Sequence, residues 1–409
     1  MNCRFCGNPL SCQFINLGHA PVSNDFLTEK QLNESEIHYP LNVLVCEKCF
    51  LVQVDEFKKA SDIFDSNYAY FSSYSTTWLE HCKKYAEMIS SRLKLNKNSL
   101  VIEVASNDGY LLQYFKEKGI PVLGIEPTSN TAKIAREKGI ETIEEFFGER
   151  LAKQLGTQNR KGDLVIGNNV LAHVPNINDF VKGLKLVLAE KGVITIEFPH
   201  LTQLIENNQF DTIYHEHFSY LSFSTVRKIF NHYGLELFDV EELPTHGGSL
   251  RIYAKHQEDD SKPVSKAVKD LLEREKQKGM NKIEYYSEFH KKADKIKYDF
   301  LNFLIEQKKK GKKIAAYGAA AKGNTLLNYC GIKKDLIEFV VDRSPQKQGK
   351  YLPGSHILVV KEEVLKQEKP DYIVILPWNL KDEISTQLDY VNAWNGKFIV
   401  AIPKLEVLN

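Results

Sequence analysis

The sequence lacks an excess of charge of either sign. Lys and Arg total 54 and Asp and Glu total 53, so the 409-residue chain has a formal net charge of +1. Proteins that bind nucleic acids or anionic membranes through surface charge carry a basic excess that attracts phosphate groups. The balanced charge therefore argues against nucleic acid and against a membrane surface as partners.

Long hydrophobic runs are also missing. The N-terminal stretch "MNCRFCGNPL" has no apolar segment of the kind found in secretory signals. The longest apolar strings, such as "DYIVILP", are far too short to span a bilayer. Hydrophobic residues make up 43% and charged residues 26%, which is typical of a globular protein. We expect a cytoplasmic, enzyme-sized protein of two or three domains.

Cysteine is scarce, and its distribution is uneven. Of seven cysteines, Cys3, Cys6, Cys46 and Cys49 form two CxxC pairs, and the others are isolated. Each pair puts two thiolates on one tight turn, and four sulfur ligands at tetrahedral geometry favour a closed, structural Zn²⁺ site. Reduced cysteines without a metal, or an iron–sulfur cluster, are the alternatives. We predict a zinc-binding module over residues 1–60.

A small-residue turn follows the first apolar strand of the middle segment. The run from Leu100 to Val104 predicts a buried strand, and a second strand in "IPVLGIEPT" ends at Glu126 and Pro127. The residues at the end of the first strand and in its turn are Glu103, Ala105, Ser106, Asn107, Asp108 and Gly109. This is a βαβ unit with an acid placed to hold a ribose. It departs from the dinucleotide pattern GxGxxG and is nearer to E-x-[GA]-x-[ND]-x-G, which is typical of S-adenosylmethionine-dependent methyltransferases.

The alternative for this turn is an ordinary strand–helix connection whose helix is capped by Asn107 or Asp108. Three further strands are predicted in "ETIEEFF", "GDLVIGNNVLAHVPN" and "KGVITIEFPHL". Strands and helices in alternation predict a doubly wound parallel sheet over residues 61–260, with ligands at the carboxyl ends of its strands. Phe146 and Phe147 are candidates to flank an adenine. Polar residues expected at those strand ends are Asn168, Asn169, His173 and residues 197–200.

The stretch "DTIYHEHFSYLS" places Tyr214, His215, Glu216 and His217 next to one another. Enzymes use His, Glu and Tyr side chains as acids and bases, so the stretch is a candidate proton-transfer site. A polar surface turn is the alternative, and for His215 a structural hydrogen bond is the favoured interpretation.

The last third of the chain begins with lysine-rich helical patterning between residues 258 and 313, whose charges indicate a solvated helix face. A second α/β unit then starts at "KKIAAYGAAAKGNTLLNYCG". Its small-residue turn, with Lys322 and Asn324, favours an anion at a helix N-terminus. Close packing of helix on sheet would also explain such a turn. We predict a domain over residues 261–409, with a helical linker followed by α/β structure.

Together these motifs resemble the sugar C-methyltransferases of deoxysugar pathways, which methylate a nucleotide-linked 4-ketosugar at carbon 3. The resemblance spans essentially the whole chain: the two CxxC pairs, "EVASNDG", "NNVLAHVPN", "EFPHL", "YHEHFSYLS", "GGSLR", "YGAAAKGNTLLNYCGI", "VVDRSPQKQGKYLPG" and "LPWN". One departure is Ala105, where the family often carries glycine. A methyl group fits there provided that the backbone is not left-handed.

The resemblance implies roles for individual residues. S-adenosylmethionine and structural Zn²⁺ are the expected cofactors, and a nucleoside-diphosphate 4-ketosugar, with deoxythymidine as the nucleoside, is the expected substrate. His217 is the implied base, with Tyr214 and Glu216 beside it. The open alternative is that His217 and a tyrosine exchange roles. His173, Tyr68 and Tyr70 are candidates for the ketone oxygen or sugar hydroxyls. Expected substrate contacts come from His200, His246, Gly247, Ser249 and Arg251, and a simple turn is the alternative for His246. The diphosphate is expected near Lys322 and Asn324, between the middle and C-terminal domains.

Three other functions are compatible with parts of the sequence. A zinc-ribbon nucleic-acid methyltransferase would want a basic face, whereas the overall charge of this chain is close to neutral. A non-catalytic sensor would not explain Tyr214, Glu216 and His217. A sugar O- or N-methyltransferase needs a base but no enolate, and the sequence separates it from the C-methyltransferases only weakly. Three domains in one chain suffice to build the site, so no protein partner is expected.

Overall fold

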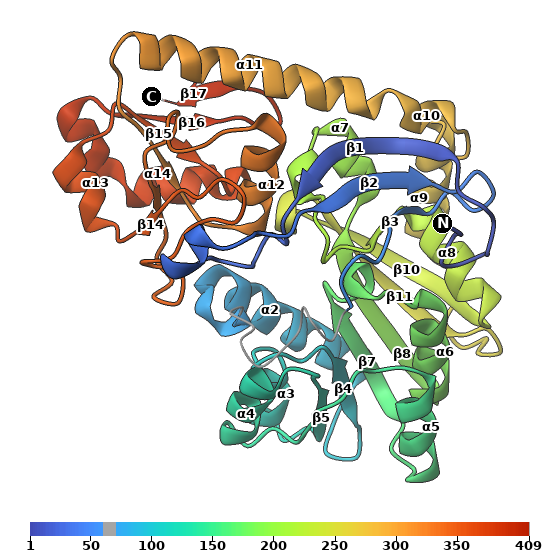
Figure 1. Ribbon diagram of the computed structural model, residues 1–409. Coiled ribbons are helices and arrows are strands. Elements are labelled where there is room, and N and C mark those ends of the chain that lie inside the picture. Colours follow the sequence, from blue (N-terminus) through green and yellow to red (C-terminus); the bar gives the residue numbers. More distant parts are fainter. Residues whose placement is uncertain (60–70, 409) are drawn as a thin grey trace. The chain divides into compact units, whose positions relative to one another are not determined.

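The computed structural model of the chain describes residues 1–59 and 71–408. Contacts divide these residues into two compact units (Figure 1). Unit 1 comprises residues 1–10, 46–200 and 218–281, and unit 2 comprises residues 11–45, 201–217 and 282–409. This partition cuts across the three segments expected from the sequence, because residues 11–45 and 201–217 contact the C-terminal part of the chain. The domain boundaries stay a prediction.

Unit 1 is built on one mostly parallel sheet. Its strand order is β10-β11-β8-β7-β4-β5-β6, and the pairs among β4 to β8 are parallel. The strands are β4 (Val101–Val104), β5 (Val122–Ile125), β6 (Thr142–Ile143), β7 (Gly162–Asn168), β8 (Leu188–Pro199), β10 (Leu235–Leu243) and β11 (Ser249–His256). A hairpin of β10 and β11 adds antiparallel strands beside β8. The predicted parallel strands and the Rossmann-like fold class are confirmed.

Helices cover both faces of this sheet, as apolar runs buried on both sides require. The helices of unit 1 are α2 (Thr76–Leu93), α3 (Leu112–Glu117), α4 (Ser129–Glu137), α5 (Glu149–Thr157), α6 (Ile177–Val187), α8 (Phe223–His232) and α9 (Lys266–Gln277), with short 3₁₀ turns η2 (Ser72–Tyr74), η3 (Leu171–His173) and η5 (Thr245–Gly247). One apolar cluster joins the sheet to α5, α6 and α8, and the other joins it to α2 and α3. A short antiparallel pair, β3 (Val52–Val54) and β9 (Ser219–Tyr220), completes the unit.

Unit 2 holds the second α/β sheet, with strand order β14-β13-β12-β15-β16-β17, parallel except for the last pair. The strands are β12 (Ile314–Tyr317), β13 (Val340–Val341), β14 (Val359–Val360), β15 (Tyr372–Ile375), β16 (Lys397–Val400) and β17 (Glu406–Leu408). The helices of this part are α12 (Ala321–Cys330), α13 (Glu363–Glu368) and α14 (Lys381–Gln387), with 3₁₀ turns η6 (Trp378–Leu380) and η7 (Asp389–Trp394).

An N-terminal hairpin also belongs to unit 2. It consists of β1 (Cys12–Ala20) and β2 (Tyr39–Val45), and the connection between them contains the 3₁₀ turn η1 (Lys30–Asn33). The long helix α11 (Phe289–Lys309) runs beside β1, with the short helix α10 (Glu284–Ser287) before it (Figure 1). Phe14 stacks on Phe289 with ring centroids 4.7 Å apart. This aromatic contact explains why the hairpin groups with the C-terminal part of the chain.

The two remaining elements of unit 2 are α7 (Leu201–Glu206) and the 3₁₀ turn η4 (Phe210–Thr212), which precede the "YHEH" stretch. Across residues 1–59 and 71–408, no helix combines the length and apolar character needed to cross a membrane.

Candidate active site

The four paired cysteines converge in unit 1. Their sulfur atoms all lie within 4.8 Å of one another, with 3.5 Å between Cys3 and Cys49 and 3.6 Å between Cys6 and Cys46. Four sulfurs at about 2.3 Å from one zinc ion would be separated by about 3.8 Å, so the donor set fits tetrahedral Zn²⁺. The Gln53 amide donates to the Cys3 sulfur at 3.3 Å. Such a hydrogen bond supports a thiolate ligand.

The two cysteine turns share one backbone geometry. Gly7 and Phe50, which follow the CxxC pairs, both have left-handed φ angles of 70° and 65°. Each donates its N–H to the carbonyl of the first cysteine of its pair, at 2.9 Å for Gly7 and 2.8 Å for Phe50. These bonds close each turn, and the four sulfur atoms of the two pairs converge.

The predicted donor-binding turn connects β4 to α3. The helix starts at Leu112, so neither Asn107 nor Asp108 caps it. The alternative prediction, an ordinary turn whose helix is capped by one of these two residues, is therefore wrong. Three of the turn residues are left-handed, with φ of 58° at Ala105, 49° at Asn107 and 76° at Gly109. A Cβ atom at Gly109 would lie 2.4 Å from the Ile140 side chain, so only glycine fits there. The methyl group of Ala105 was expected to fit only if the backbone there is not left-handed, and the φ of 58° shows that this condition is not met.

Carboxylates surround this turn. Glu103 is fully buried near the end of β4, and burial raises its pKa well above the usual range, although a hydrogen bond from Tyr110 opposes the shift. Glu126, at the end of β5, accepts the N–H groups of Asn107 and Thr128, each at 2.9 Å. Burial also raises the pKa of Glu126. An acidic, buried rim of this kind fits a ligand with positive charge, such as the ammonium and sulfonium groups of S-adenosylmethionine.

The aromatic segment before α2 is attached to the same turn. The N–H of Ser72 donates to the side-chain oxygen of Asn107 at 2.9 Å, and the Ser73 hydroxyl donates to Asp108. Oδ2 of Asp108 also lies 3.5 Å from Nζ of Lys138, which makes an ion pair. Tyr68 and Tyr70, predicted to touch the substrate, lie outside the described residues. Pro127, Phe146 and Phe147 follow β5 and β6, and Phe147 packs edge-on against Phe180 while Phe146 is exposed.

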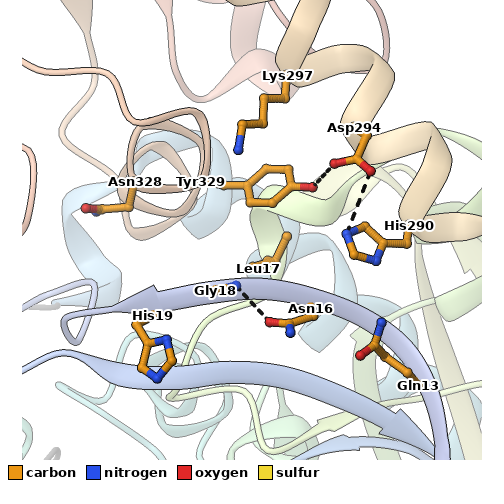
Figure 2. A pocket seen from close by; sticks show the side chains of 10 residues that line it. All are labelled: Gln13, Asn16, Leu17, Gly18, His19, His290, Asp294, Lys297, Asn328 and Tyr329. Carbon is orange, nitrogen blue, oxygen red and sulfur yellow. Dashed lines mark hydrogen bonds and ion pairs between the residues drawn. The ribbon is translucent and has the colours of Figure 1, made fainter.

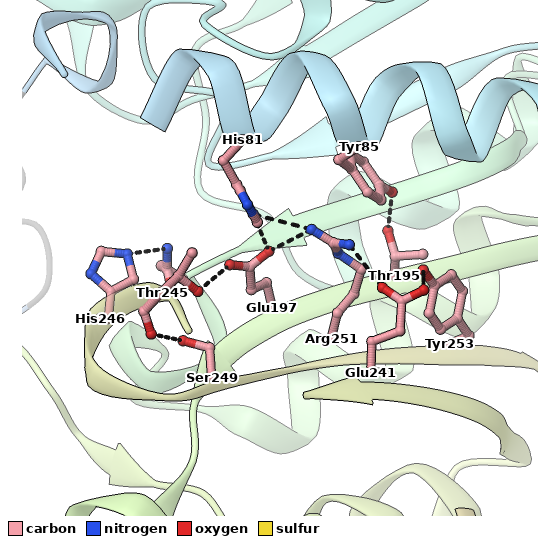
Figure 3. Close-up of polar contacts among 11 residues, drawn as sticks. His81, Tyr85, Thr195, Glu197, Glu241, Thr245, His246, Ser249, Arg251 and Tyr253 are labelled. Carbon is pink, nitrogen blue, oxygen red and sulfur yellow. Dashed lines mark hydrogen bonds and ion pairs between the residues drawn. The ribbon is translucent and has the colours of Figure 1, made fainter. Parts of the chain in front are cut away.

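A buried ionic cluster is built around Glu197 of β8 and Arg251 of β11 (Figure 3). Glu197 is fully buried and accepts hydrogen bonds from Arg251 and His81, both at 3.0 Å, and from the Thr245 hydroxyl at 2.9 Å. Burial alone would raise the pKa of Glu197, but the hydrogen bond from His81 and the charge of Arg251 outweigh burial and lower it. Arg251 also pairs with Glu241 at 2.9 Å. Its guanidinium, predicted to touch the substrate, is thus engaged by two carboxylates.

This cluster holds the loop that carries His246. Thr245 is tied to Glu197, and the Ser249 hydroxyl donates to the Thr245 carbonyl at 2.9 Å. The Asn169 amide donates to Nε2 of His246 at 3.1 Å. Asn169 and His246 are both left-handed, with φ of 54°. Gly247 follows in the same turn. The structure thus brings together two residues predicted for different ligands, Asn169 for the cofactor and His246 for the substrate.

Two other predicted histidines of unit 1 differ in their surroundings. His200 is buried and pairs with Glu275 at 2.8 Å, and this carboxylate also accepts the N–H groups of Phe223 and Ser224 at the start of α8. His200 thereby fastens the end of β8 to α8 and α9. His173 ends the turn after β7, where Asn168 is the last strand residue, and its side chain is half-buried.

The "YHEH" stretch lies in unit 2. Nδ1 of His217 is 2.9 Å from the Thr212 carbonyl, and Nε2 is 2.9 Å from the Tyr214 hydroxyl. A carbonyl oxygen only accepts, so Nδ1 carries a hydrogen, and Nε2 is the nitrogen that accepts a proton. Glu216 is buried and accepts from the Asn24 amide at 3.1 Å.

His215 points elsewhere. Its Nε2 donates to the Pro40 carbonyl at 3.2 Å, the ring meets Tyr39 edge-on, and burial lowers its pKa. This is the structural hydrogen bond that the sequence favours for His215.

Helix α12 brings the predicted diphosphate residues to the same stretch. The Thr325 hydroxyl donates to the Ile213 carbonyl at 2.9 Å, and the buried Asn324 amide donates to the Ser23 carbonyl at 2.6 Å. Lys322 donates to Asn379 at 2.6 Å and lies 5.0 Å from the centre of the Trp378 ring. The Ala319 N–H in the preceding turn is engaged by Asp342 at 2.7 Å.

Sequence reasoning missed Asp211 and Trp378 beside Lys322. The Trp378 indole donates to the fully buried Asp211 at 2.7 Å. Burial raises the pKa of Asp211 to about 6, although the charge of Lys322 opposes the shift. Asp211 is the first residue of the quoted "DTIYHEH" stretch, and its charge beside apolar residues was the available signal.

A separate cavity of about 470 Å³ opens in unit 2 between β1, α11 and α12 (Figure 2). Its lining includes Asn16, His19, His290, Lys297 and Tyr329. Among the described residues, none of those predicted for catalysis or ligand binding lines this cavity.

Comparison with known proteins gives matches over most of the chain. The family model "Methyltransferase domain" matches residues 78–240, "C-methyltransferase C-terminal domain" matches residues 244–403, and "Putative zinc binding domain" matches residues 3–64. C-methyltransferase NovU of Streptomyces niveus is 33% identical over 407 residues, which cover 100% of this chain and 96% of that protein.

Similar solved structures include two proteins with low sequence identity. The PH0226 protein of Pyrococcus horikoshii OT3 is 16% identical with a TM-score of 0.38, over 46% of this chain and 95% of that one. Magnesium protoporphyrin IX methyltransferase of Synechocystis PCC 6803, with bound SAM, is 15% identical with a TM-score of 0.32, over 44% of this chain and 80% of that one.

Proposed function

Because the chain belongs to the C-methyltransferase family and uses S-adenosylmethionine as its methyl donor, we propose that its acceptor is carbon 3 of a nucleoside-diphosphate-linked 4-ketosugar. A sugar C–H bond is a very poor acid, but a ketone on the neighbouring carbon allows removal of the proton as an enolate forms. The enzyme then needs one base, and groups that stabilise the oxyanion. The donor supplies an electrophilic methyl group when it is bound.

The observation that carries this proposal is the pairing of His217 with Tyr214. Nδ1 of His217 is fixed by the Thr212 carbonyl, so Nε2 is the acceptor, and the Tyr214 hydroxyl lies 2.9 Å away. The proton from carbon 3 ends on Nε2, either directly or by passage through the Tyr214 oxygen. A base positioned in this way contributes about 10²–10⁴ to the rate.

Other residues of unit 2 support an anionic sugar nucleotide as the substrate. Lys322, at the start of α12, provides a cation, and the N-terminus of this helix favours negative charge. Since Asp342 already engages the Ala319 N–H, we assign the diphosphate to Lys322 and the first turn of α12. His173, Tyr68 and Tyr70 are kept as candidates for the ketone oxygen, and deoxythymidine as the nucleoside. We assign the donor to the acidic turn after β4 in unit 1.

The experiment follows deuterium and methyl incorporation by mass spectrometry. Deoxythymidine-diphospho-4-ketosugars are incubated with the protein in D₂O, with and without S-adenosylmethionine. The proposal expects a methyl group on carbon 3 and exchange of the carbon 3 proton. A methyl group mapped to an oxygen or nitrogen of the sugar, with no exchange at carbon 3, would overturn the enolate route.

His217→Asn tests the base itself. The asparagine amide can still donate to the Thr212 carbonyl but cannot take up a proton, so we expect exchange at carbon 3 to fall about 10²-fold or more. Affinity for S-adenosylmethionine, measured by calorimetry, should not change. The control is His290→Asn on α11, which should exchange at the wild-type rate. Near-normal exchange in His217→Asn would remove His217 from its assigned role.

A further inference from the structure

The ring of Trp78, in the first turn of α2, lies among groups from separate parts of unit 1. Its centroid is 6.1 Å from that of Tyr110, 5.5 Å from that of His246 and 5.0 Å from that of His81, on which it stacks. The side chain is half-buried. A large aromatic ring is thus fixed in place but still partly accessible.

The neighbours of Trp78 mark the donor-binding edge of the sheet. Tyr110 directly follows Gly109 in the turn after β4, and His246 accepts a hydrogen bond from Asn169 just beyond β7. The carboxyl ends of parallel strands are where such sheets bind ligands. Trp78 therefore contacts immediate neighbours of Gly109 and Asn169, two of the residues that are predicted to hold the cofactor.

The orientation of the Trp78 ring is fixed from the protein interior. His81 stacks against it with an interplanar angle of 19°. His81 in turn donates to the buried Glu197 at 3.0 Å, which also pairs with Arg251 (Figure 3). The chain before α2 is anchored as well, through the bonds of Ser72 and Ser73 to the donor turn. Such support holds a ring in one position before any ligand arrives.

We propose that Trp78 forms an aromatic face of the donor pocket and recognises the positive charge of the sulfonium group. Indole is the aromatic side chain that attracts cations most strongly. After methyl transfer the sulfur is a neutral thioether, so this attraction is lost with the charge. Trp78 thereby favours donor over product and helps the spent cofactor to leave. The inference does not depend on which acceptor the enzyme uses.

The test compares the affinities of the full chain for S-adenosylmethionine and S-adenosylhomocysteine by calorimetry. The two ligands share their adenosine and amino-acid groups, so the difference isolates the sulfonium charge. Trp78→Leu should weaken donor binding about 2- to 30-fold and product binding much less. Trp78→Phe, which keeps an aromatic face, should give a smaller loss of the preference for donor. Equal weakening of both ligands, or no weakening of either, would overturn the proposal.

Tryptophan fluorescence provides a second readout. The chain has three tryptophans, and the proposal expects the emission change on donor binding to come from Trp78. It should disappear in Trp78→Phe and persist in the control Trp394→Phe, whose indole donates to the Pro370 carbonyl in unit 2. A change that persists in Trp78→Phe would count against the assignment. If Trp78→Leu binds neither ligand, Trp78→Phe decides the question. The proposal is then overturned if Trp78→Phe prefers S-adenosylmethionine over S-adenosylhomocysteine as strongly as the wild type does.

Discussion

Replacing Arg251 by methionine should destabilise unit 1 strongly. The substitution removes ion pairs to Glu197 at 3.0 Å and to Glu241 at 2.9 Å, and a cation–π contact 4.4 Å above the Tyr85 ring. Of the side chains that bond Glu197 in the wild type, only His81 and Thr245 would remain in the variant. Glu197 would still be fully buried. Removing one member of a buried pair typically costs about 3–5 kcal/mol. For a unit of this size that corresponds to a melting temperature lower by roughly 6–20 °C.

The dependence of this loss on pH tests its cause. In the wild type the pKa of Glu197 is lowered, so its contribution to stability is present above its unfolded pKa and is lost as the pH falls through the folded value. Without Arg251, burial dominates and the carboxyl group binds a proton more readily. Protonation removes the uncompensated charge, so the destabilisation should be smaller at pH 5 than at pH 8.

Thermal unfolding of both proteins at several pH values measures this difference. Arg274→Met is the matched control, because Arg274 pairs with Glu242 in the same unit with both side chains about half exposed. Exposed pairs contribute at most about 1 kcal/mol. The explanation fails if Arg251→Met loses no more stability than Arg274→Met, or if its loss grows towards pH 5.

Two further predictions concern the donor turn and the cysteine cluster. Ala105→Gly should stabilise the protein by about 1 kcal/mol in urea unfolding, because Ala105 has a left-handed φ of 58°; a stability below that of the wild type would show that the methyl group contributes packing that outweighs the strain. Cys49→Ser should release zinc, which elemental analysis measures, whereas Cys12→Ser should retain full zinc content. Cys49→Ser should also lower the melting temperature of unit 1, because Cys49 belongs to the same apolar cluster as Leu184 and Phe198.

Local patterns in the sequence predicted the parts of the molecule that depend on neighbouring residues. The two CxxC pairs, the small-residue turn after β4 and the apolar strands each occupy a few consecutive positions, and each was located correctly. The closeness of Tyr214 to His217 also follows from their spacing of three residues. Features of this kind are fixed by local geometry, which sequence periodicity and turn chemistry describe well.

The contacts that the sequence did not predict join residues far apart in the chain. Glu197 meets His81 from 116 residues away, and Asp211 meets Trp378 from 167 residues away. Glu197 lies in the apolar stretch "GVITIEF" and Arg251 in "GGSLRIYA", and nothing in either stretch specifies that the two charges pair with one another. The grouping of residues 11–45 with the C-terminal part depends in the same way on Phe14 meeting Phe289. Only the tertiary fold specifies such partners.

Backbone strain gives an independent argument for where unit 1 holds its ligand. In the described residues, left-handed positions such as Lys94 and Asn395 terminate helices, where this conformation is common. Ala105, Asn107, Asn169 and His246 terminate no regular helix, yet all four are left-handed and follow the ends of β4 or β7 or lie between β10 and β11. Each such residue costs about 1–3 kcal/mol and persists only where its surroundings enforce it. Here the surroundings are identifiable: Glu126 and Ser72 hold Asn107, and Thr245, tied to Glu197, holds the turn of His246. Strain and support both occur at the edge of the sheet to which we assign the donor, which a purely structural turn would not require.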